Sequence, residues 1–62
     1  MEDLVTKMYH VTTIQTLENK ISGSPSEYAA LSKLSEAQLG QLRDSLVIEY
    51  NEMLEDQQNT NN

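Results

Sequence analysis

The stretch Leu34-Ser35-Glu36-Ala37-Gln38-Leu39 decides how this 62-residue chain is organised. Ser35 and Gln38 have the S-x-x-Q spacing of a capping box, in which each side chain accepts a hydrogen bond from a backbone N–H at a helix start. Leu34 and Leu39 occupy the flanking positions of a hydrophobic staple. The pattern therefore predicts that a helix begins at residue 36.

We expect this helix to cover residues 36–56. Its apolar side chains recur at three- and four-residue spacing, which is typical of an amphipathic helix. The stripe that they form provides the predicted core or self-association residues, which are Leu39, Leu42, Leu46, Tyr50 and Met53. Residues 57–62 contain no apolar side chain, and we expect them to be a disordered tail.

Two further helices are predicted before residue 34. Apolar residues at helical spacing, from Leu4 through Met8, Val11, Ile14 and Leu17 to Ile21, indicate a helix over residues 3–22. The Val- and Thr-rich stretch around Thr12 leaves open a strand over residues 1–11, or a break there. Gly23 suits the position after the helix, and Ser24-Pro25-Ser26-Glu27 has the pattern of a helix start, which predicts a short helix over residues 25–34.

These elements predict an all-α fold in one domain, residues 1–56, with the two long helices packed as an antiparallel hairpin. Ordering roughly 50 residues at about 1.5 kcal/mol each costs roughly 75 kcal/mol, and burying on the order of 3,000 Å² of apolar surface returns a similar amount. The chain has no Cys, so no disulfide can supply additional stability. We therefore expect a homodimer, in which two hairpins form a four-helix-like bundle.

The charge of the chain is −6, from ten acidic and four basic residues. The four bases are scattered, whereas phosphate binding needs clustered Lys and Arg, so direct binding of DNA or RNA is not expected. No apolar run is long enough to cross a membrane, and the acidic start Met1-Glu2-Asp3 differs from a signal peptide. We expect a cytoplasmic protein.

The chemistry-bearing residues do not form an enzymatic pattern. His10 is the only histidine, and no nucleophile or second metal ligand stands at a matching spacing, so we expect no catalytic residue, metal or cofactor. Residues 43–62 carry five acids and one base. On a helical wheel four exposed positions gather on the polar side, and we assign them to partner binding: Asp44, Ile48, Glu52 and Glu55. Ile48 is either an interface anchor or an ordinary exposed residue.

Small size, acidity and the lack of a catalytic constellation indicate a regulatory or inhibitory accessory protein, of the kind found in phages, plasmids and bacterial regulatory circuits. Its acidic third helix would bind a larger cytoplasmic protein, one with a basic surface. Two alternatives stay open. The chain could be a structural or assembly component whose main partner is itself, or a nucleic-acid mimic that occupies a basic groove.

Overall fold

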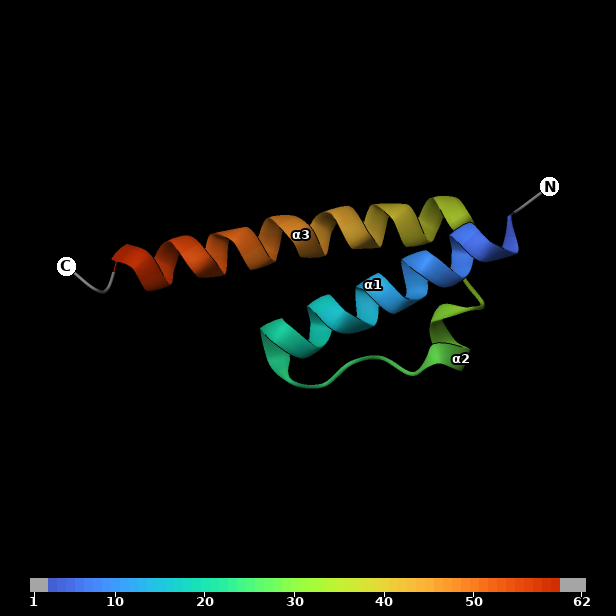
Figure 1. Cartoon of the computed structure of the whole chain (residues 1–62), viewed down its shortest axis with the longest axis horizontal. Helices are drawn as coiled ribbons and strands as arrows, with labels where there is room; N and C mark the ends of the chain where they lie inside the picture. Colours follow the sequence, from blue (N-terminus) through green and yellow to red (C-terminus); the bar gives the residue numbers. More distant parts are fainter. Residues whose placement is uncertain (1–2, 60–62) are drawn as a thin grey trace.

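The computed structural model describes residues 3–59, which form three helices: α1 (Leu4–Ser22), α2 (Tyr28–Leu31) and α3 (Glu36–Asn59) (Figure 1). No residue in this range lies in a strand, so the predicted all-α fold is confirmed. The two long helices pack against each other, and α2 packs against α1.

Helix α1 is continuous across Thr12, which settles the choice between a helix and a strand in favour of the helix. Thr12 and Thr16 donate their hydroxyls to the carbonyls of Met8 and Thr12, at 2.9 and 3.0 Å, so these residues are accommodated within the helix. Gly23 ends the helix with a left-handed φ of 76°, which only glycine adopts without strain, and its N–H donates to the carbonyl of Asn19.

Asp3 caps the start of α1. Its carboxylate accepts hydrogen bonds from the Thr6 hydroxyl at 2.9 Å and from the Val5 N–H at 3.0 Å. These bonds, the one from Thr6 foremost, hold the pKa of Asp3 below its usual value because they favour the charged form. The cap therefore works at neutral pH and is lost only when acid protonates Asp3.

The second helix is shorter than predicted. Helix α2 covers only Tyr28–Leu31, and the expected start at Ser24-Pro25 is wrong. The reason is a set of contacts between residues 24–27 and α1: the Ser26 N–H and hydroxyl donate to the two carboxylate oxygens of Glu18, at 2.9 and 2.8 Å. The Gln15 amide donates to the Ser26 carbonyl at 3.2 Å. These tertiary hydrogen bonds hold the segment extended along α1 and prevent the helix start that the local sequence pattern predicts.

The start of α3 is as predicted. The Ser35 N–H donates to Gln38 Oε1 at 2.9 Å, and the Gln38 N–H donates to Ser35 Oγ at 3.2 Å, so the capping box is formed. The end differs: α3 continues to Asn59, beyond the predicted end near residue 56, because no Gly or Pro stops it. The predicted tail is thus wrong for residues 57–59, and its last three positions, 60–62, lie outside the described residues.

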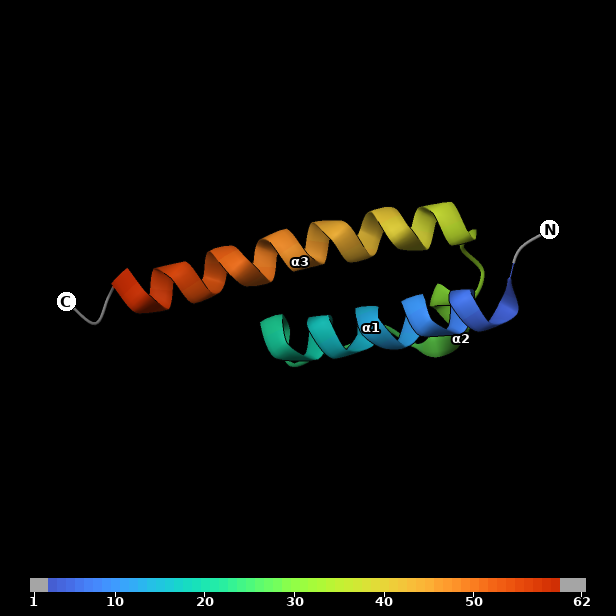
Figure 2. The same ribbon diagram turned by 45° about the horizontal axis from the view of Figure 1, so that its top comes forward.

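The long helices run in the same direction, and the predicted antiparallel hairpin is wrong. Figures 1 and 2 show that α1 and α3 both begin at the N-terminal end of the molecule and that the segment between them crosses back along α1. Helix α1 is about 28 Å long at 1.5 Å per residue. Residues 23–35, partly extended, are long enough to return over that distance. Helix α3 therefore starts beside the start of α1.

The core is small and lies where the three helices meet. It consists of four buried side chains, with three partly buried leucines packed against them: Val11, Ile14, Leu31 and Leu39, then Leu34, Leu42 and Leu46. Beyond this cluster, the end of α3 projects past the end of α1 (Figure 2). Burial is therefore concentrated in the first half of α3.

We expect Ser35→Ala to lower the free energy of unfolding by about 1 kcal/mol, because it removes the side chain that caps the start of α3. Urea unfolding followed by circular dichroism measures the change. Ser45→Ala is the matched control, since Ser45 is exposed within the same helix and should be neutral or slightly stabilising. Equal effects of the two substitutions would show that the capping box does not stabilise α3.

We expect Glu18→Ala to destabilise the fold by about 2 kcal/mol, because the Ser26 N–H and hydroxyl lose a charged acceptor. Amide hydrogen exchange should show faster exchange at Ser26 first. Glu49→Ala, at an exposed position of α3, is the control and should leave exchange at Ser26 unchanged. Unchanged protection of Ser26 in Glu18→Ala would rule out the carboxylate as the group that holds this segment.

Candidate binding surface

The acidic face of α3 consists of Asp44, Ile48, Glu52 and Glu55, the positions assigned to partner binding from the sequence. Because successive residues turn by about 100° around a helix, spacings of four, four and three place these side chains on one side of α3. All four are exposed in the structure. Ile48 has 60% of its surface exposed, so an apolar side chain lies among carboxylates.

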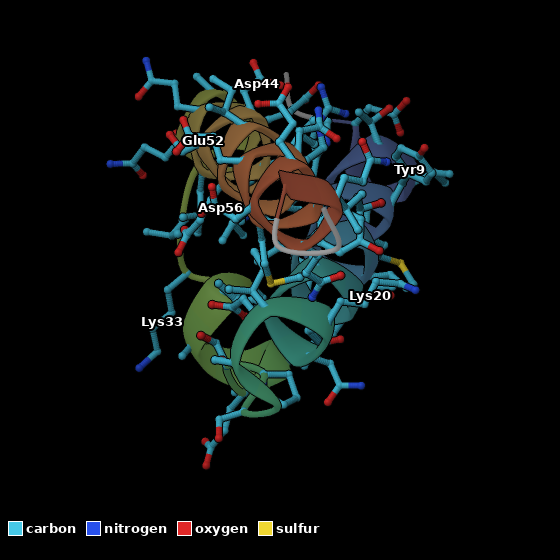
Figure 3. The ribbon with its side chains drawn as sticks, turned by 90° about the vertical axis from the view of Figure 1, so that its left-hand side faces the viewer. Tyr9, Lys20, Lys33, Asp44, Glu52 and Asp56 are labelled. Atoms are coloured by element: carbon cyan, nitrogen blue, oxygen red, sulfur yellow. The ribbon has the colours of Figure 1, made fainter. Side chains whose placement is uncertain are left out.

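This face points away from the other helices. Figure 3, viewed along α3, shows Asp44 and Glu52 on the outer side of that helix, whereas Tyr9 and Lys20 project from α1 on another side of the molecule. The opposite side of α3 provides the stripe residues. Leu39 is buried, Leu42 and Leu46 pack against the core, and the others, Tyr50 and Met53, are half-buried farther along the helix.

One edge of the acidic face is linked to α1 through Arg43. Its guanidinium lies 3.4 Å from the Asp44 carboxylate and 3.2 Å from Nδ1 of His10. A guanidinium only donates hydrogen bonds, so this contact requires His10 to accept at Nδ1 and to carry its proton on Nε2. His10 is half-buried and lies beside the ring of Tyr9. Arg43 therefore lies between α1 and α3. The spacing of residues along the sequence could not predict this contact.

The acids of α3 are placed unfavourably for the helix itself. Glu52 has three acidic neighbours one helical turn away, Glu49, Glu55 and Asp56, and like charges at this spacing repel. The last turn of α3 contains no basic residue to interact favourably with the helix dipole. Helix stability therefore gives no reason for this charge distribution.

A second exposed surface, which the sequence pattern did not predict, lies on the first half of α1. Leu4, Val5, Met8 and Tyr9 are all exposed, although Leu4 and Met8 belong to the stripe that identified this helix. The drift of that stripe around the helix was the available signal, because Leu4 and Met8 face a direction different from that of Ile14.

The described residues 3–59 contain no pocket, and none of their His, Asp and Glu side chains form a group of three or more that could hold a metal ion. None of the described helices combines the length and apolarity needed to span a bilayer.

We expect Glu52→Gln to raise the free energy of unfolding at low salt by about 0.5–1 kcal/mol, because it removes three repulsive pairs. The gain should disappear in about 1 M salt, where the Debye length is only about 3 Å. Glu36→Gln is the control of opposite sign, since an acid in the first turn stabilises a helix. Thermal unfolding at the two salt concentrations measures both. A loss of stability in Glu52→Gln would contradict the repulsion.

Comparison of this chain with protein-family models, with curated proteins and with solved structures finds no match.

Proposed function

We propose that this chain is a small, acidic, non-enzymatic module of regulatory or inhibitory type, which binds a larger cytoplasmic protein through the acidic face of α3. The observation that carries the proposal is the 60% exposure of Ile48 among Asp44, Glu52 and Glu55. An exposed apolar side chain with carboxylates before and after it along the helix matches the general anatomy of a protein interface, which has an apolar centre and a polar rim.

The charges of this face define the chemistry of the partner. A complementary surface has an apolar pocket for Ile48 with Lys or Arg around it. Carboxylates at the rim speed the encounter with a basic surface, and salt screens that attraction. The repulsion among Glu49, Glu52 and Glu55 in the free helix supports the same view, because a basic partner would relieve it.

We expect Ile48→Gln to weaken partner binding about ten- to a hundredfold, because burial of such a side chain stabilises a complex by about 1.5–3 kcal/mol. Tyr28→Gln is the matched control, since Tyr28 is 45% exposed on a different helix. Each tagged variant is used to capture proteins from an extract of the cells that make this chain, at about 0.1 M and about 1 M salt. Affinities are then measured with the purified partner.

The proposal requires one protein to be retained by the wild type and by Tyr28→Gln, to be lost with Ile48→Gln, and to bind more weakly at the higher salt. Equal retention of that protein by Ile48→Gln would contradict it. Recovery of this chain alone would favour the assembly component instead. Competition between DNA and this chain for the same surface of the captured partner would favour the nucleic-acid mimic.

The predicted homodimer is a separate proposal. Three of the five apolar residues expected to form its core are used within one chain, where Leu39, Leu42 and Leu46 meet Val11 and Ile14. A dimer through the same stripe would compete with this core, so a different surface is needed.

A further inference from the structure

The exposed side of α1 carries no charge over most of its length. Between residues 4 and 19, its exposed residues are all neutral, and we call these seven the α1 face: Leu4, Val5, Met8, Tyr9, Thr12, Thr16 and Asn19. The charged residues nearest to it are the exposed Lys20 at its end and the half-buried Lys7 and Glu18 along one edge. Figure 3 shows Tyr9 and Lys20 on the same side of the molecule, on a side different from Asp44 and Glu52.

The α1 face is more apolar than its composition indicates. The hydroxyls of Thr12 and Thr16 donate to carbonyls of their own helix, at 2.9 and 3.0 Å. Their hydrogen-bond donors are therefore satisfied within the chain, and covering the face would leave neither donor without an acceptor. The hydroxyl groups consequently oppose burial of this face less than free hydroxyls would.

The size of the α1 face is sufficient for a small interface. Its large side chains are exposed to 70% at Leu4, 74% at Val5, 47% at Met8 and 63% at Tyr9. Side chains of this size and exposure present on the order of 500 Å² per copy. A contact between two such faces buries about 1,000 Å², which is near the lower limit of specific interfaces.

We infer that the α1 face binds the α1 face of a second copy, with the two helices antiparallel and the twofold axis at Thr12. Antiparallel pairing about Thr12 places Lys20 of one copy beside Leu4 of the other, and it opposes the two helix dipoles. Parallel pairing would oppose Lys20 to Lys20 and would align the dipoles.

The charge distribution also favours self-association through the α1 face over self-association through α3. Pairing through α3 would oppose two copies of the acidic face, and like charges across an interface disfavour association. Pairing through α1 leaves Asp44, Ile48, Glu52 and Glu55 uncovered in both copies. The dimer would therefore present two partner-binding faces, and the two surfaces can be tested separately.

Single cysteines test the contact directly, because the chain has no Cys of its own. Under mild oxidation we expect Thr12→Cys to form a disulfide-linked dimer, since the twofold axis brings the two positions together. Val5→Cys should cross-link with Asn19→Cys in a mixture but not with itself, because these positions lie equally far from Thr12 on either side. Ile48→Cys is the control and should stay unlinked. Dimers of Ile48→Cys without dimers of Thr12→Cys, or self-linking of Val5→Cys, would overturn the proposal.

Sedimentation velocity over a concentration series gives an independent readout. The wild type should reach twice its chain mass of 7.0 kDa. Val5→Asp should raise the dimer dissociation constant at least about tenfold, while circular dichroism should show an intact fold, because an acid in the first helical turn favours the helix. Ile48→Asp should keep the wild-type mass. A wild type that stays at 7.0 kDa up to about 1 mM, or equal effects of the two substitutions, would contradict the inference.

Discussion

The hydrogen bonds between Glu18 and Ser26 determine how the chain can return along α1. They fix residues 24–27 as an extended segment, which places Leu31 against Val11 and Ile14. The segment then delivers Ser35 to the end of the molecule where α1 begins, so α3 runs parallel to α1. The partly buried carboxylate of Glu18 thus influences both the direction of α3 and which residues enter the core.

The sequence was sufficient for features that depend on neighbouring residues. The capping box of Ser35 and Gln38 and the glycine stop at Gly23 both involve contacts within a few positions. The direction of α3 and the length of α2 were not predictable in this way, because they depend on Glu18 reaching a residue eight positions later. The positions of the acidic face follow from helical spacing alone, whereas the contact between His10 and Arg43 joins residues 33 positions apart.

The two exposed surfaces differ in charge because the two long helices carry different compositions. Helix α1 has its neutral residues outward, and α3 has its acids outward. Such a division separates the two contacts, since the neutral face offers no charge to a basic partner and two acidic faces disfavour pairing with each other. Association through α1 and recognition through α3 can then occur together without competition for the same residues.

Because α3 projects past α1, tertiary contacts support one end of the acidic face more than the other. Asp44 lies on the same stretch of helix as Leu42 and Leu46, which pack against the core, whereas Glu55 belongs to the last two turns of α3, at the end that projects. A helix end with little tertiary support opens at a low free energy and frays more often than the middle. A partner that contacts the whole face must therefore order the far end as it binds, which lowers its affinity but allows that end to adapt to surfaces of different shape.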